Sequence, residues 1–181
     1  MKKLVEFLKD HDSDTYYHSF RVADLSFKIA KTMELTENEQ QITYYAGLLH
    51  DIGKLRVKKE ILAKPAKLTQ DEWSCIQQHP IYGHEILNKY PLLDNEIKYV
   101  VLLHHERSNG SGYPFKLREI EIPLKAKIVA IADTFDAMTN NRVYSRAKTV
   151  NEALSIIKSE NGSLFDPVVI EALDRLMDVK V

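Results

Sequence analysis

The residues of this sequence that can do chemistry are histidines and aspartates at the ends of apolar runs. His50-Asp51 stands in LLHDIGK, His104-His105 in LLHHERSNGSGYP and Asp133 in IVAIADTFDAMT. At these positions the polar side chains are expected to point into the core, where an unpaired polar side chain is costly. Because imidazole and carboxylate groups are common metal ligands, the pattern predicts a buried metal site.

Two further histidines extend this set. His18 shares the apolar stripe of a helical segment with Val22 and Ile29, at three- and four-residue spacing, so it is expected to face the core. His79 precedes Pro80, where one helix is expected to end and another to begin. Alone, His18 would be interpreted as a satisfied core residue, but its place in an ordered set favours a ligand.

The candidate ligands are too many for one ion. They are His18, His50, Asp51, His79, His104, His105 and Asp133. They suit two metals if one carboxylate, most plausibly Asp51, bridges them. Two such ions hold a bridging hydroxide as nucleophile and neutralise charge in a phosphoryl displacement, so the predicted substrate is a phosphate ester. Asp14, four residues before His18, is either a ligand to a third ion or a helix N-cap.

The donor types limit the choice of metal. Histidine and carboxylate ligands suit Fe, Mn or Zn. A site with many histidines and few cysteines argues against a closed structural zinc. The single Cys75 excludes an intramolecular disulfide and is interpreted as a small packing residue in a helix.

Apolar periodicity is helical through almost the whole chain, and no segment argues strongly for a strand. After a first long helix through His18, helices are expected over 37–50, 69–78, 80–90, 94–105, 123–139, 149–159 and 166–178. Thr69/Glu72 and Thr149/Glu152 have the spacing of capping boxes. The predicted fold is all-α: a single-domain bundle of about seven helices over residues 1–181. Loops near 55–68 and 108–123 are the expected access region.

Composition excludes several classes of function. With 25 Lys and Arg against 26 Asp and Glu, the net charge is −1, which argues against binding a nucleic-acid polymer. No run of 18 apolar residues and no signal-peptide cleavage pattern occurs, so neither a membrane span nor a membrane partner is expected. The sequence predicts a cytoplasmic location.

The motifs HSFRVA, LLHDIGK, QQHPIYGHEIL, LLHHERSNGSGYP and IADTFDAMT also carry a family resemblance. In this order they resemble the HD-GYP branch of the HD-domain metal-dependent phosphohydrolases, from about Asp12 to Ala147. His79, the His104-His105 pair and the GYP run at 112–114 narrow the resemblance to that branch. It implies a helical HD-domain fold and a phosphodiesterase that opens cyclic di-GMP to linear pGpG, GMP or both.

The resemblance also implies residue roles and a cofactor. The seven candidate ligands match metal ligands of a two- or three-ion centre, commonly of iron or manganese, with zinc as a further option. Asp14 stands where some members place a third-metal glutamate. Lys54 and Arg142 match positions that contact substrate phosphate, where they would offset charge in the transition state. Arg146 stands beside another basic position of the family.

Three positions depart from the family pattern. Asn109 stands where aspartate is usual, which removes a carboxylate but keeps a side chain that favours turns. Ser145 replaces a basic residue, which bears on substrate affinity. Ala66 replaces a glycine, which would stiffen its loop slightly.

Residues near the motifs receive supporting roles. Glu106 and Thr134 are predicted to orient ligand imidazoles by accepting their second N–H. Asp136 and Thr139 are expected to stabilise the helix or support ligands. Tyr113 either stacks on a guanine or packs its loop.

Other polar residues are expected to stand apart from the site. His11 and His84 are interpreted as structural or surface residues. Lys58, Lys59, Lys64 and Lys67 are expected on a solvated loop, with one of them able to reach substrate.

Three functions stay open at this point. The first is hydrolysis of cyclic di-GMP, in which Asp51 and Lys54 would be catalytic. The second is hydrolysis of another cyclic dinucleotide or nucleotide, motivated by Asn109 and Ser145. The third is a metal-binding signalling scaffold without turnover. A homodimer or a signalling protein is a candidate partner in each case.

Overall fold

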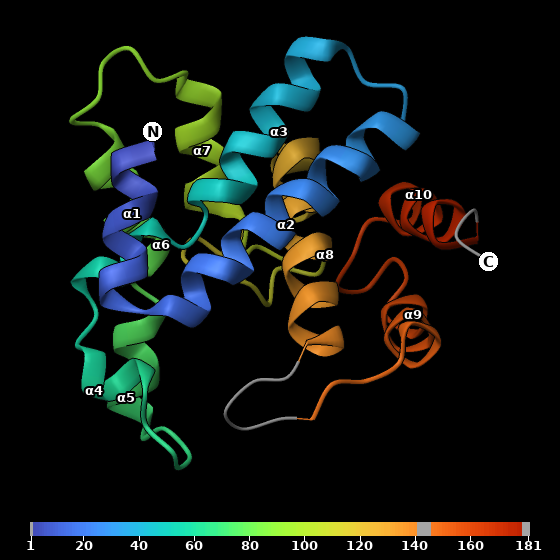
Figure 1. Cartoon of the computed structure of the whole chain (residues 1–181). Helices are drawn as coiled ribbons and strands as arrows, with labels where there is room; N and C mark the ends of the chain where they lie inside the picture. The colour runs from blue at the N-terminus through green and yellow to red at the C-terminus, as the bar shows by residue number, and fades with distance from the viewer. Residues whose placement is uncertain (1, 141–145, 179–181) are drawn as a thin grey trace.

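The computed structural model describes residues 2–140 and 146–178, which form helices joined by loops (Figure 1). The α-helices are α1 (Lys2–His11), α2 (Ser13–Thr32), α3 (Glu37–Leu49), α4 (Lys59–Leu62), α5 (Gln70–Ile76), α6 (His79–Leu87), α7 (Asn95–Leu103), α8 (Leu124–Thr139), α9 (Val150–Ser159) and α10 (Pro167–Asp178); the 3-10 helices are η1 (Ile52–Arg56) and η2 (Glu119–Glu121). Within these ranges, β-pairing is limited to two isolated bridges. The predicted all-α class is confirmed.

The helix count exceeds the expected number because short elements were not anticipated. Helix α1 precedes the first expected helix, and the four-residue α4 lies inside the expected loop at 55–68. Four residues make about one turn, too few for a periodic apolar pattern.

Local capping determines where several helices begin. Thr69 and Glu72 form the predicted capping box at α5, and Thr149 and Glu152 form that of α9. The N-cap of α2 is Asp12, whose carboxylate accepts a hydrogen bond from the Asp14 N–H. Asp14 lies inside the first turn, so its interpretation as the N-cap is wrong.

The core joins helices from both ends of the chain. Ile29 of α2, Leu49 of α3 and Ile131 of α8 are completely buried, and all belong to one apolar cluster. Helices α9 and α10 pack on α8 and add Ile157 and Leu173 to the cluster (Figure 1). No helix in the described ranges is long and apolar enough to cross a membrane.

A close backbone contact joins η1 to α6 beside the predicted site. A Cβ at Gly53 would lie 1.9 Å from the His79 carbonyl oxygen and 2.5 Å from the Gly83 nitrogen. Only glycine allows this approach. Since Asp51 is the N-cap of η1 and His79 begins α6, the contact determines how close these two side chains come.

Candidate metal centre

The predicted ligands come from six elements of the fold. His18 lies in the middle of α2 and Asp133 in α8, whereas His50 and His104 are the C-caps of α3 and α7. Asp51 precedes η1, His79 begins α6 and His105 follows His104. His50, Asp51, His79 and His104 are each no more than 2% exposed, so water does not solvate them. Burial of this many polar groups is costly unless a partner compensates.

The ligand atoms of the seven residues converge. Asp51 lies in the middle: Oδ2 is 3.2 Å from His50 Nε2, and Oδ1 is 3.3 Å from His79 Nε2. Asp133 Oδ1 is 3.0 Å from His18 Nε2 and 4.0 Å from His50 Nε2. His105 groups with His79 and His104, with ligand atoms within 4.8 Å of one another.

Hydrogen bonds fix the tautomers of three histidines. The Nδ1 atoms of His50, His79 and His104 lie 2.7, 2.8 and 2.8 Å from the carbonyl oxygens of Gly47, Ile76 and Val101. A carbonyl oxygen only accepts, so each Nδ1 carries a proton and donates it. In the neutral imidazole, Nε2 then presents a lone pair toward the cluster.

Two of these lone pairs face each other. His79 Nε2 and His104 Nε2 are 3.2 Å apart. Burial lowers the pKa of His79 to about 4 and that of His104 well below its usual value, so both rings are neutral near pH 7. Two facing lone pairs repel unless a cation lies between or beside them. His50 Nε2 is also buried without a hydrogen-bond partner. The donor set therefore fits divalent metal ions.

The carboxylates are held ionised in this buried site. Burial disfavours the charged form of Asp51. Electrostatic attraction to His50 and Lys54 outweighs this effect and keeps the pKa of Asp51 well below the usual value. Burial likewise opposes ionisation of Asp133, and the hydrogen bond with His18 outweighs it, so its pKa is also well below the usual value. Ionised carboxylate oxygens beside imidazole nitrogens are the combination that iron, manganese and zinc accept.

His18 is oriented by a charged relay instead of a backbone carbonyl. Its Nδ1 lies 2.6 Å from Asp136 Oδ2, and Arg21 donates to both carboxylate oxygens of Asp136 at 2.8 and 3.0 Å. Asn140 adds a further hydrogen bond at 2.9 Å. Asp136 thus orients a predicted ligand, one of the two roles that the sequence suggested for it. Arg21 was missed, although its position three residues after His18 places it on the same helical face.

Burial by itself would lower the pKa of His18, but hydrogen bonds with Asp133 and Asp136 outweigh it and raise that pKa. Because a proton and a metal would compete for the same ring nitrogen, we expect metal binding by His18 to depend on pH.

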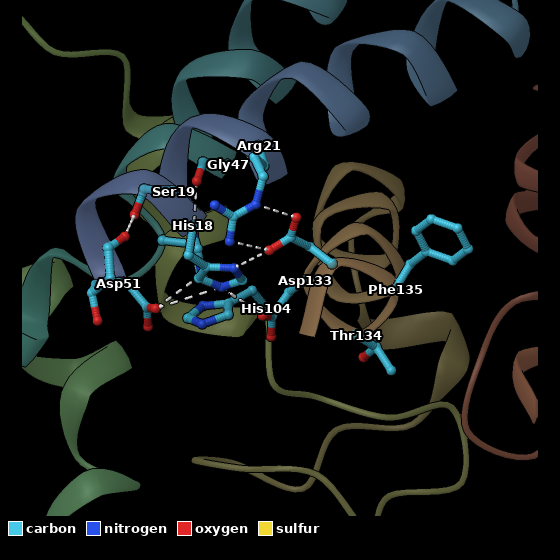
Figure 2. A network of polar contacts seen from close by, with 12 residues as sticks. His18, Ser19, Arg21, Gly47, Asp51, His104, Asp133, Thr134 and Phe135 are labelled. Atoms are coloured by element: carbon cyan, nitrogen blue, oxygen red, sulfur yellow. Dashed lines mark hydrogen bonds and ion pairs between the residues drawn. The ribbon is translucent and has the colours of Figure 1, made fainter. Parts of the chain in front are cut away.

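Two supporting residues do not act as predicted. The Glu106 carboxylate accepts hydrogen bonds from the backbone N–H groups of Phe115 and Leu117, at 2.7 and 2.9 Å. Its role is to hold the loop after the GYP run, not to orient an imidazole. The Thr134 hydroxyl donates to the Ala130 carbonyl, and Figure 2 shows its side chain directed away from His18 and Asp51.

Other predictions on single residues are resolved by local contacts. Asn109 Oδ1 accepts from the Ser111 N–H, which confirms its turn-forming role. Thr139 donates to the Phe135 carbonyl and stabilises α8. His11 contacts the Val57 carbonyl and His84 contacts Asn88, so both have structural partners, as expected. Cys75 is exposed, so its interpretation as a packing residue is wrong.

A cavity of about 1200 Å³ opens onto the cluster. Lys54 lies at its wall with Nζ 2.7 Å from Asp51 Oδ2, and Asp14 and Tyr113 also line it. The Tyr113 ring stacks on His105, with centroids 4.6 Å apart. Arg142 lies outside the described residues, and Arg146 is not part of the described lining. Both expected access loops contribute, through residues 61–68 and Tyr113.

The model of the HD domain matches residues 2–169. The chain belongs to the HD-domain family. Among curated HD-domain relatives, it is 42% identical to "Cyclic di-GMP phosphodiesterase" of Thermotoga maritima, over 91% of this chain and 45% of the relative. It is 36% identical to "3'3'-cGAMP-specific phosphodiesterase 1" of Vibrio cholerae, over 86% of this chain and 37% of the relative. The chain thus spans less than half the length of these relatives, and the predicted family membership is confirmed.

Solved structures show the same HD-domain fold. An HDGYP protein from Bdellovibrio bacteriovorus, Bd1817, matches with a TM-score of 0.73 and 21% identity, covering 89% of this chain and 51% of that one. The HD domain of Listeria monocytogenes phosphodiesterase PgpH, in complex with cyclic-di-AMP, matches with a TM-score of 0.67 and 18% identity, covering 98% and 95%. The cluster of histidines and aspartates therefore sits in an HD-domain scaffold.

Proposed function

We propose that this chain is a metal-dependent phosphodiesterase that hydrolyses cyclic di-GMP to linear pGpG, GMP or both. The observation that carries the proposal is the convergence of five buried or half-buried imidazoles and two carboxylates at one cavity. The names of its relatives in Thermotoga maritima and Xanthomonas campestris, at 42% and 37% identity, support cyclic di-GMP as the substrate.

We infer that the seven predicted residues hold two ions, with Asp51 between them, and that Asp14 serves a third. Asp51 supports this arrangement because its two oxygens lie near different histidines, His50 and His79. Iron or manganese is the proposed metal, with zinc as a further option, since the donors are imidazole and carboxylate and Cys75 is not among the residues that line the cavity. When bound, such ions lower the pKa of the attacking water and offset charge on the phosphoryl oxygens.

The chain's own residues would orient the phosphodiester. Lys54 uses one N–H on Asp51, and an ammonium group has three, so two remain for phosphate oxygens. Lys54 would thus link the substrate to a metal ligand and stabilise charge that develops in the transition state. Arg142 and Arg146 are proposed as further phosphate contacts. Burial raises the pKa of Tyr113, so its hydroxyl stays protonated and is a hydrogen-bond donor.

The test is a chromatographic assay of cyclic di-GMP with anaerobically purified protein that carries Mn or Fe. Linear dinucleotide or GMP is expected with the wild type and not with Asp51→Asn. Absence of product from wild-type protein with stoichiometric metal would refute the proposal.

A second candidate substrate is a mixed cyclic dinucleotide. It is favoured by 36% and 37% identity to two Vibrio cholerae proteins named 3'3'-cGAMP-specific phosphodiesterases. Running cyclic di-GMP, 3'3'-cGAMP and cyclic di-AMP in the same assay separates these substrates by their kcat/KM values.

A further inference from the structure

The only tryptophan of the chain lies at the cavity beside the metal centre. Trp73 is on α5, is 42% exposed and lines the cavity. An indole ring exposed in a concave site offers a large flat surface that a planar ligand can cover. No metal chemistry requires such a ring, so its presence calls for a different explanation.

Aromatic rings connect Trp73 to the metal cluster. The Tyr113 ring stacks on the predicted ligand His105 with an interplanar angle of 25°, and it meets Trp73 edge to face with centroids 6.5 Å apart. One face of Tyr113 is therefore covered by an imidazole. Trp73 contacts the other side of this aromatic pair, one ring further from the predicted ligands than Tyr113.

The position of Trp73 is fixed by contacts that do not involve metal ligands. Glu72, its neighbour, closes the capping box with Thr69 and accepts a hydrogen bond from Lys64 at 2.6 Å. Helix α5 is thereby tied to the segment before it. The backbone that carries Trp73 is thus ordered by these contacts, which lowers the entropy cost of stacking a ligand on its ring.

The segment at 61–68 contributes mainly apolar residues to the cavity wall, with Lys67 as its one charged lining residue. Ile61, Leu62, Pro65 and Leu68 line it together with Trp73, whereas Asp51, Lys54 and His79 line the metal end. The cavity thus has a charged end suited to phosphate and an apolar, aromatic end suited to a flat ring. Its volume of about 1200 Å³ exceeds that of a typical small-ligand site, as a dinucleotide requires.

We propose that Trp73 is a substrate-binding residue that stacks on one purine base of a cyclic dinucleotide. The inference rests on the proposed function for its choice of ligand. Stacking on an aromatic ring holds a base in the ground state and the transition state alike, so it acts on KM and leaves kcat unchanged.

The first test is steady-state kinetics with cyclic di-GMP. Trp73→Leu is expected to raise KM roughly tenfold, with kcat within about twofold of wild type, and Trp73→Phe is expected to recover most of the loss. Helix α5 contains no buried residue, so both variants should keep the fold. Tyr99→Leu is the matched control, because Tyr99 is 55% exposed on α7 and is not among the residues that line the cavity.

The second test is binding without turnover. In metal-free protein, cyclic di-GMP is expected to quench the fluorescence of Trp73, with N-acetyltryptophanamide titrated in parallel to correct for absorption. Hydrolysis by wild type together with unquenched fluorescence and unchanged KM in Trp73→Leu would overturn the stacking proposal and leave the activity standing. Quenching without hydrolysis would support the base site and refute the phosphodiesterase. If cyclic di-GMP neither quenches the fluorescence nor is hydrolysed, the stacking proposal and the phosphodiesterase proposal are both overturned.

Discussion

Replacing Gly53 by alanine tests whether the contact between η1 and α6 builds the metal centre. The added Cβ would lie 1.9 Å from the His79 carbonyl oxygen, whereas close carbon-oxygen contacts are normally about 3.3 Å or longer. The two backbones must therefore separate by more than about 1 Å. The obstacle is backbone of α6, not the end of a flexible side chain, so it cannot move aside alone.

Overpacking of this kind costs about 3 kcal/mol of unfolding free energy, the upper end of the usual range. For a domain of this length that lowers Tm by roughly 6–12 °C. The same separation would pull His79 away from Asp51, whose closest atoms are 3.3 Å apart. Metal content should fall in parallel, because the ligands must stay in place to share an ion.

The assay is thermal unfolding of metal-free Gly53→Ala, followed by metal analysis after loading with Mn. Gly162→Ala is the matched control: Gly162 has φ +69° and nothing within 4 Å of an added Cβ. It should cost only about 1 kcal/mol through its left-handed backbone, with metal content unchanged. Gly53→Ala with wild-type Tm and metal content would refute the reasoning.

Three other perturbations have defined outcomes. Asp136→Asn should weaken Mn binding about 10- to 100-fold in calorimetric titrations, because it weakens the relay that orients His18. The surface variant Asp174→Asn should bind Mn as wild type does. Equal Mn affinities of the two variants would contradict this reasoning. Burial opposes protonation of His18, but hydrogen bonds with Asp133 and Asp136 outweigh it and raise its pKa, so Mn affinity should fall as the pH is lowered through that raised pKa and protons compete for Nε2. A flat profile would argue against His18 as a ligand. Burial of Asp166 opposes its ionisation, but hydrogen bonds from Lys127 and backbone N–H groups outweigh it and lower its pKa. Ionised Asp166 therefore stabilises the folded protein above about pH 4, and this contribution is lost as pH falls through the folded-state pKa. In urea unfolding, Asp166→Asn should therefore lose stability at pH 6 and show a shallower decline toward pH 3.

Sequence patterns were sufficient for the features that depend on neighbours along the chain. Capping boxes such as Thr69/Glu72 and the helical stripe through His18 follow local rules, and the structure has both. The candidate ligands converge because each stands at the end or on the inner face of such a helix.

Features that depend on tertiary contacts could not be predicted in the same way. Arg21 contacts Asp136 across 115 residues of sequence, so only the packing of α2 on α8 brings the pair together. Glu106, which follows His105 in sequence, was predicted to orient an imidazole. Its carboxylate instead turns to the backbone of residues 115 and 117, whose N–H groups lack strand or helix partners.

One physical rule accounts for the orientation of three of the predicted ligand histidines. His50, His79 and His104 each donate Nδ1 to the carbonyl three residues earlier, and those carbonyls belong to the last turns of α3, α5 and α7. A helix leaves its last carbonyls without backbone donors, so the histidine satisfies one of them and its Nε2 is turned toward the cluster.

The position of these histidines at helix ends also makes the cluster favourable for cations, and it explains why His18 differs. The last turns of three helices meet at the cluster, and each carries partial negative charge that stabilises a bound cation. His18 lies in the middle of α2, where the carbonyls already accept helix hydrogen bonds, so no carbonyl is available to fix its tautomer. The Asp136 carboxylate replaces the carbonyl there, and Arg21 holds that carboxylate in place. The relay is therefore what a ligand in the middle of a helix requires and a ligand at a helix end does not.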